Sequence, residues 1–222
     1  MNWRNFLYLS CSLSLTTLSL NAAKSTQGWW SDYDYSQISS QVVSRNQEPA
    51  LLRGQAIKLD LDKQKITAYY DTGDMNLRYV ALDAITFNGT PWNGSHGGNS
   101  LITGDILFSN KASLAWAHKG SWKDPRKNDY APLPDQYVEY LGSYRHGQHA
   151  IQSYSVGDSR TQVLECPTTE QNNAQLVFTR HFNIAEVKEN LKLKVFDNPT
   201  IKINQNLFVK SSGPKIQSDS SG

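Results

Sequence analysis

The chain has 222 residues, of which 38% are hydrophobic, 11% aromatic and 19% charged, and its formal net charge is +2. This length suits one domain with a hydrophobic core, and the composition excludes an intrinsically disordered chain. The nearly balanced charge also excludes a polybasic nucleic-acid tail, so we expect no nucleic-acid partner.

The first 23 residues have the features of a signal peptide. One positive charge, at Arg4, precedes an apolar stretch over residues 6–20, and small residues follow at Ala22 and Ala23. The stretch is shorter than the roughly 20 apolar residues that a membrane-spanning helix needs. We therefore expect cleavage, no transmembrane segment afterwards, and a periplasmic or extracellular protein.

The mature chain is expected to be a single β-rich domain over residues 24–210 with a disordered tail over 211–222, whose serine- and glycine-rich composition is that of a linker. Cys166 would be its one cysteine, because Cys11 leaves with the leader. An exported chain with one cysteine has no intrachain disulfide. We interpret Cys166 as a small buried apolar residue at the end of a strand, before Pro167.

The segments that follow in the chain alternate apolar and polar residues with a period of two, which predicts strands. They are 55–61, 65–70, 77–81, 85–88, 106–109, 137–145, 150–156, 161–165, 175–183, 191–195 and 200–209. A turn at Asn198 and Pro199 predicts a hairpin between the last two, and residues 184–190 suit either a short helix or a wide loop. Many short strands without helical periods favour an all-β fold, an antiparallel β-sandwich.

A long segment over residues 89–136 interrupts this pattern. It is rich in glycine, proline, asparagine and tryptophan, and loops of that length in a compact domain are usually functional or packed insertions. Its glycines around His96 match neither a phosphate-binding loop nor a dinucleotide fingerprint. No Cys-x-x-Cys-His motif for covalent haem occurs either, and we expect no cofactor.

The polar candidates allow two interpretations each. Asp71, Asp74 and Arg78 flank a glycine-containing turn, where carboxylates serve as acid/base groups or ligands for calcium or sugar, or cap the turn backbone. His146 and His149 suit a metal pair or solvated turn residues, and we expect no metal. The candidate ligand-binding residues are Asp71, Asp74, Arg78, Trp92, His96, Trp122, Asp124, Arg126 and His146.

The aromatic residues of the long segment are equally open to two interpretations. Trp92, Trp116, Trp122, Tyr130 and Tyr137 either stack on sugar rings, if exposed, or seal a core that the loops cover.

Several pieces of the sequence, in this order, resemble a known family. They are residues 32–35, 53–59, 70–74, 87–92 with 96–97, 124–126, 131–134, 144–147 and 154–158. Together they resemble an uncharacterised bacterial domain near the N-terminus of large exported proteins, which often carry c-type haem or sugar-dehydrogenase-like propeller domains. The resemblance covers most of residues 30–185. It implies location and architecture, and no catalytic residue is carried over from it.

The resulting hypothesis is an exported β-sandwich module that binds carbohydrate or a partner protein domain. A carbohydrate-active hydrolase or lyase is one alternative, with acid/base groups among Asp71, Asp74, His96 and His146. An accessory role in a periplasmic haem or dehydrogenase assembly is the other, and it follows only from the resemblance.

Overall fold

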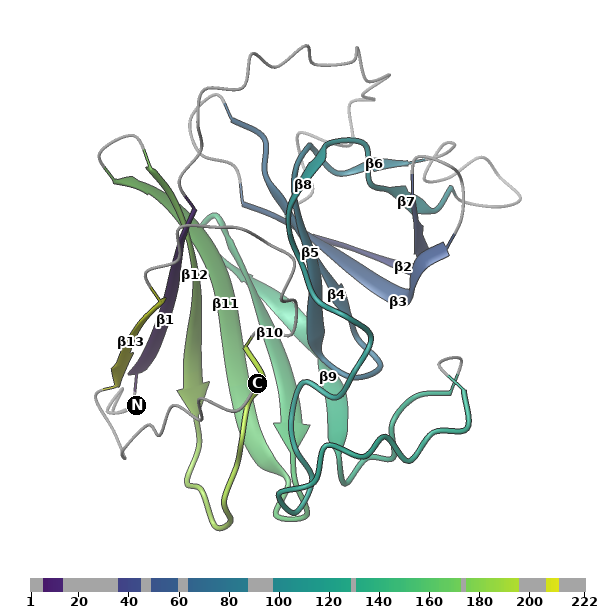
Figure 1. Cartoon of the computed structure of the whole chain (residues 1–222), viewed down its shortest axis with the longest axis vertical. Helices are drawn as coiled ribbons and strands as arrows, with labels where there is room; N and C mark the ends of the chain where they lie inside the picture. The colour runs from purple at the N-terminus through teal and green to yellow at the C-terminus, as the bar shows by residue number, and fades with distance from the viewer. Residues whose placement is uncertain are drawn as a thin grey trace.

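The computed structural model describes residues 6–13, 36–44, 49–59, 64–87, 98–128, 131–172, 175–195 and 207–211, which form two β-sheets packed face to face (Figure 1). The first sheet has six strands, in the order β13 (Leu207–Ser211), β1 (Phe6–Leu13), β12 (Gln175–Ile184), β11 (Thr161–Asn172), β10 (His149–Val156) and β9 (Val138–His146). The second has seven, in the order β6 (Thr86–Phe87), β7 (Ser100–Leu101), β2 (Ser36–Val43), β3 (Pro49–Lys58), β4 (Thr67–Asp71), β5 (Asn76–Leu82) and β8 (Asp105–Ser109).

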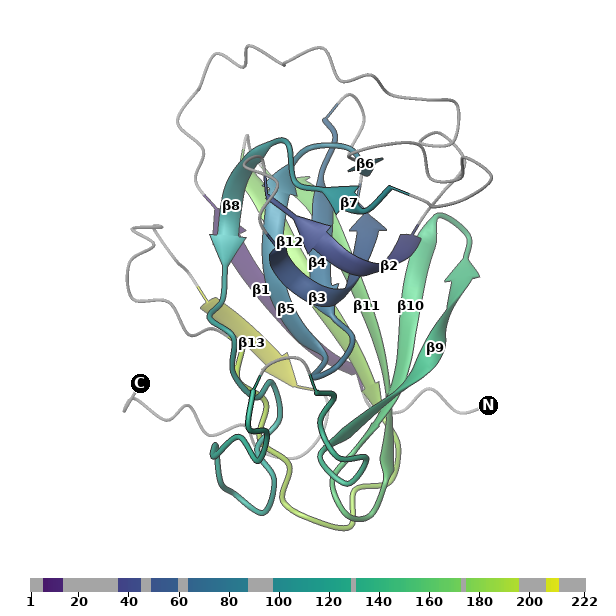
Figure 2. The ribbon, with the colours of Figure 1, turned by 90° about the vertical axis from the view of Figure 1, so that its right-hand side faces the viewer.

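The all-β sandwich expected from the sequence is confirmed. Neighbouring strands of both sheets pair antiparallel, except that β2 and β7 run parallel. Figure 2, turned by 90°, shows the seven-stranded sheet lying across the six-stranded one. Within the described ranges no helix is long and apolar enough to cross a membrane.

Some of the sequence-based expectations differ from the structure. The short helix considered for residues 184–190 is absent, because β12 runs to Ile184 and residues 185–190 are irregular. Residues 191–195 form no regular strand, and Leu193 makes one isolated bridge to Trp116. The other strand predicted for that hairpin spans residues 200–209. Its residues 200–206 lie outside the described residues, and residues 207–209 belong to β13, which pairs with β1.

Other strands were not expected. The polar segment of β2 and the two-residue β7 have weak apolar patterns, and they pair at one edge of the seven-stranded sheet. Strand β1 lies inside the predicted signal peptide and pairs with β12 and β13. Export and cleavage stay predictions, and the sequence pattern alone carries them.

Among the described residues, three apolar clusters form the core. One lies between the sheets and includes Ile57, Tyr70 and Phe178. A second lies on the six-stranded sheet and includes Tyr154 and Phe182, and the segment with Leu114, Trp116 and Leu133 covers it. The third is on the outer face of the seven-stranded sheet, where Tyr69 and its neighbours are covered by the chain around Ile85 and Ile102. The five residues of β4 are all buried. Successive side chains point to opposite faces of the strand, and the first cluster covers the face with Tyr70 while the third covers the face with Tyr69.

Candidate functional site

The tight turn between β4 and β5 carries two of the predicted site residues. Asp71 Oδ1 accepts the backbone N–H of Gly73 at 2.8 Å, and Asp74 Oδ1 accepts that of Asn76 at 2.9 Å. These bonds match the capping interpretation of the two aspartates. Met75, at the end of the turn, has a left-handed backbone with φ of 54°, and so does Arg53 beside it on β3, with φ of 49°. Such strain persists only where the surroundings hold it in place.

A distant arginine completes this site. Arg126 forms a fork with Asp124, with Nη2 at 2.6 Å from Oδ2 and Nε at 3.0 Å from Oδ1. The same Nη2 lies 3.5 Å from Oδ2 of Asp74, and the Arg126 side chain is 4% exposed. We call Asp71, Asp74, Asp124 and Arg126 the turn cluster. It ties the segment that follows β8 to the β4–β5 turn, as does the bond from Leu133 N–H to the carbonyl of Gly73.

The three aspartates of the turn cluster have pKa values that are shifted in different directions. Burial, with the Asp71 carboxylate beside it, raises the pKa of Asp74 to about 7, against the lowering effect of its hydrogen bond from Asn76 and of Arg126. Burial also raises the pKa of Asp71, although Arg53 lies 3.8 Å away. The hydrogen bonds from Arg126 instead lower the pKa of Asp124, which is nearer to solvent.

The burial of this cluster limits its chemistry. The side chain of Asp74 is 1% exposed, so a substrate would reach it only if the surrounding chain moved. Among the described residues no group of three or more histidine, cysteine, aspartate or glutamate side chains is placed to hold a metal ion. The geometry therefore suits a structural role, in which the cluster holds the long segment against the β4–β5 turn.

The other predicted site residues lie apart from the turn cluster or beside it. Arg78 is beside it, because its charge acts on both Asp71 and Asp74, while its Nε donates to the carbonyl of Asn110 at 3.2 Å. His146 pairs with His149 across the β9–β10 hairpin, exposed, as solvated turn residues would be. Trp92 and His96 lie outside the described residues.

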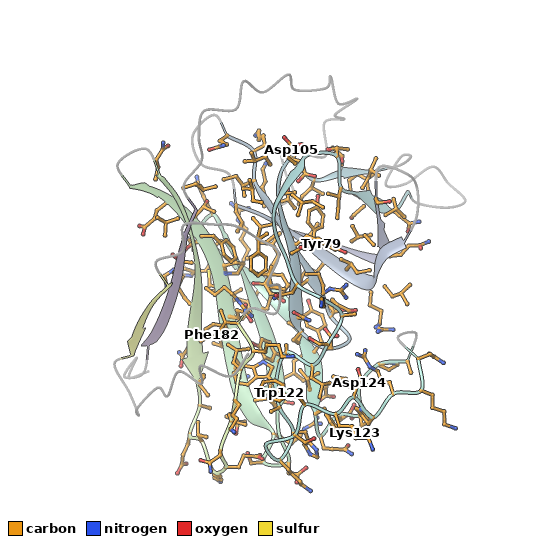
Figure 3. All side chains as sticks on the ribbon, viewed as in Figure 1. Tyr79, Asp105, Trp122, Lys123, Asp124 and Phe182 are labelled. Atoms are coloured by element: carbon orange, nitrogen blue, oxygen red, sulfur yellow. The ribbon has the colours of Figure 1, made fainter. Side chains whose placement is uncertain are left out.

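In its described part, the long segment exposes one tryptophan and buries another. Trp116 is 4% exposed and packs in the second core cluster, edge-on to Phe182 with ring centroids 6.3 Å apart. Trp122 is 41% exposed. Figure 3 shows it with Lys123 and Asp124 at one end of the sandwich, with Asp105 at the other. Of the two interpretations of these aromatics, sealing the core holds for Trp116 and an exposed aromatic surface holds for Trp122.

The chain on the N-terminal side of Trp122 is held by several contacts. Ala117 N–H donates to the carbonyl of Lys192, and Lys194 N–H to that of Ala115. Residues 118 and 121 then exchange backbone hydrogen bonds around Lys119 and Gly120, which have φ of 51° and 77°. Two positive φ values in succession are those of a tight type I′ hairpin turn.

This hairpin is also fixed to the six-stranded sheet. His118 stacks on Tyr137 with ring centroids 4.0 Å apart, and its Nε2 lies 2.8 Å from Oδ1 of Asp158 in the β10–β11 turn. Lys119 reaches the other oxygen of Asp158 at 2.9 Å. With Arg126 held on the other side, Trp122 is exposed between two anchored stretches of chain, which we call the platform loop, residues 115–126.

A second ionic cluster, absent from the sequence-based candidates, lies between the sheets. Glu165 on β11 is fully buried and its carboxylate accepts three bonds: from Tyr70 at 2.7 Å, from Tyr154 at 2.8 Å and from Nε of Arg180 at 2.7 Å. We call these four residues the inter-sheet cluster. Its one sequence signal is Arg180, the charged residue that interrupts the apolar alternation of β12.

The position of Cys166 differs in part from the one that the sequence predicted. It is half-buried, and burial raises the pKa of its thiol to about 11, so the thiolate that reacts is scarce at neutral pH. It lies within β11 instead of at a strand end, because the strand continues through Pro167 to Asn172.

The central part of the chain is similar to a known family of domains. A family model described as a domain of unknown function, DUF6797, matches residues 60–165. The match contains the whole turn cluster, the platform loop and Glu165, and it ends before Arg180. The chain matches no curated protein and no solved structure. Residues 60–165 of the chain are therefore similar to the domain of unknown function DUF6797.

Proposed function

We propose that the protein is a binding module that takes carbohydrate at the platform loop, with Trp122 as the stacking surface. The observation that carries this proposal is the exposure of Trp122 on a loop anchored at both sides. A tryptophan indole offers a large flat apolar area, and sugar rings present flat apolar faces to such surfaces.

The fixed backbone of the loop supports the proposal. Binding costs entropy when a loop must be ordered, and that cost falls when the loop is already held. The 118–121 hairpin and the Asp124–Arg126 fork hold the chain on either side of Trp122 without using its exposed surface. An exposed tryptophan that merely filled space would not need such support.

The turn cluster contributes to this function as a support. Arg126 spans from Asp124, two residues beyond Trp122, to the buried Asp74. Because Asp74 and Asp71 are buried, the proposal gives them no contact with ligand. This assignment separates the stacking surface, which meets the ligand, from the carboxylates beneath it.

The test is glycan-array binding of the purified chain, followed by titration calorimetry with the best-binding glycan. We expect saturable binding with a shift in tryptophan fluorescence. Trp122→Ala should weaken binding at least ten-fold, because removing a central aromatic contact commonly costs more than about 1.4 kcal/mol.

Tyr144→Ala is the matched control. Tyr144 is 47% exposed but lies toward the far end of β9, so its loss removes an exposed aromatic ring away from the platform loop. Its binding should equal that of the unmodified chain. Absence of binding to every glycan, or equal weakening in both variants, would overturn the proposal.

A further inference from the structure

We propose that the carbohydrate taken at Trp122 is anionic, a glycan that carries carboxylate or sulfate groups. This inference rests on the proposed function and adds the ligand's charge. It starts from Lys194, whose Nζ lies over the Trp122 ring at 5.0 Å from the centroid. A cation–π contact of this kind orients the indole and places a positive charge at the stacking surface.

Further positive charge flanks the same surface. Lys123 follows Trp122 directly, and Lys192 lies two residues before Lys194. Leu193, between Lys192 and Lys194, packs toward the second core cluster, and alternation along an extended segment directs its two neighbours away from that core. Both Lys123 and Lys192 are exposed.

Two described carboxylates on the platform loop or against it are already paired with positive charges. Asp124 is paired with Arg126, and Asp158 with His118 and Lys119. Within the described part of the chain, Lys123 and Lys192 contact no carboxylate. Since the whole chain has a formal charge of only +2, this positive surface is local and not a result of a generally basic protein.

A neutral sugar would gain only the stacking contact at such a surface. A uronate or sulfate group beside the stacked ring would add charge-assisted bonds to lysine ammonium groups that lie at the rim. The combination of an aromatic face with surrounding lysines therefore favours anionic glycans over neutral ones of the same shape.

The experiment compares matched probes by calorimetry. Dextran sulfate is compared with dextran for sulfate, and polygalacturonate with its methyl ester for carboxylate. The full chain should bind an anionic member at least ten-fold more tightly than its neutral partner. The Lys123→Gln/Lys192→Gln variant should lose about five-fold toward the anionic probe, with a weaker salt dependence and no change toward neutral glycans.

Three variants distinguish a specific site from general attraction between charges. Lys194→Arg should retain binding, since it keeps both the charge and the cation–π contact, whereas Lys194→Gln should weaken it. Lys65→Gln, which removes one charge before β4, at the end away from the β4–β5 turn, is the matched control and should change nothing. Trp122→Ala should weaken anionic binding at least ten-fold, because charge alone does not require a ring.

The outcomes separate the two proposals. Equal Trp122-dependent binding of charged and neutral probes would overturn the anionic preference and leave carbohydrate binding in place. Anionic binding that is unaffected by Trp122→Ala would overturn the inference, since it would be attraction between charges alone. Failure of every probe and every glycan would overturn both proposals.

Discussion

Two ionic clusters lie one residue apart on β4, and they are built in opposite ways. Tyr70 belongs to the inter-sheet cluster, where one carboxylate meets one guanidinium and two phenols. Asp71 belongs to the turn cluster, where three carboxylates surround Arg126. The first has one carboxylate against one guanidinium. In the second, Asp71 and Asp74 lie beside each other, and the nearby arginines only partly offset the effect of burial on their pKa values. Burial alone therefore does not determine how such a cluster behaves, because the neighbouring charges also matter.

The two clusters differ in the pKa values of their titrating groups. In the inter-sheet cluster burial and the Glu165 charge raise the pKa values of Tyr70 and Tyr154. Although burial opposes its charge, the Glu165 carboxylate raises the pKa of Arg180, so its guanidinium stays charged. These three groups keep their charge state at neutral pH. In the turn cluster the pKa of Asp74 is about 7, so this cluster changes its charge within the physiological range.

The largest expected effect is in the inter-sheet cluster. Glu165→Gln should lower the free energy of unfolding by about 3–5 kcal/mol in urea denaturation, because it leaves the buried charge of Arg180 without a counter-charge. Arg180→Met combined with Glu165→Gln should recover part of that loss, since both charges are then absent. A double variant as unstable as the sum of the single variants would show that the two residues do not act as a pair.

A smaller loss of stability is expected when Arg126 is removed from the turn cluster. Arg126→Met should cost about 2–3 kcal/mol at pH 8, because the buried Asp74 then lacks its guanidinium partner. Hydrogen exchange should also speed up across residues 115–126. At pH 5, where Asp74 holds its proton, the cost should be smaller. An equal cost at both pH values would contradict the assigned partnership.

The pH dependence of stability gives a third test. The pKa of Asp74 is raised to about 7 in the folded chain from an ordinary 3.8, so the folded state binds more protons than the unfolded state between these values. The free energy of unfolding should therefore fall as pH rises from about 4 to about 7. Asp74→Asn should remove most of this fall, and Asp71, whose pKa is also raised, should account for the remainder.

This third test also has a control in the other cluster. Tyr70→Phe removes a hydrogen bond to Glu165 and should lower stability without changing its slope against pH between 4 and 7. A pH slope that Asp74→Asn leaves unchanged would show that Asp74 ionises in the folded chain near its ordinary pKa.

The smallest expected effect on stability is that of replacing Trp122, which we compare with replacing the buried Trp116. Trp122→Ala should change the free energy of unfolding by less than about 0.5 kcal/mol, because the ring is partly in water and the loop is held by other residues. Trp116→Ala should cost about 3–5 kcal/mol, because it empties a buried site against Tyr154 and Phe182. Comparable losses in the two variants would mean that Trp122 serves the fold.

Much of the architecture could be predicted from local patterns. Alternation with a period of two is a property of neighbouring residues, and it located most of the strands, including β9, β10 and β12. The carboxylates of the β4–β5 turn were also found locally, because aspartates beside a glycine turn cap the backbone within a few residues. By the same local reasoning, turn residues were one interpretation of His146 and His149, and these two residues pair across the β9–β10 hairpin.

What depended on tertiary structure was the choice of partners. Glu165 and Tyr70 are 95 residues apart, and Arg126 and Asp74 are 52 apart, so no local pattern pairs them. The strand period does not show which tryptophan is covered. Only the packing of the long segment on the six-stranded sheet buries Trp116 while Trp122 stays exposed. Local patterns were enough to predict most strands and turns, because these follow from short-range backbone preferences. The residue pairs and the exposed surface could not be predicted, because they arise when segments far apart in the chain pack together and exclude water.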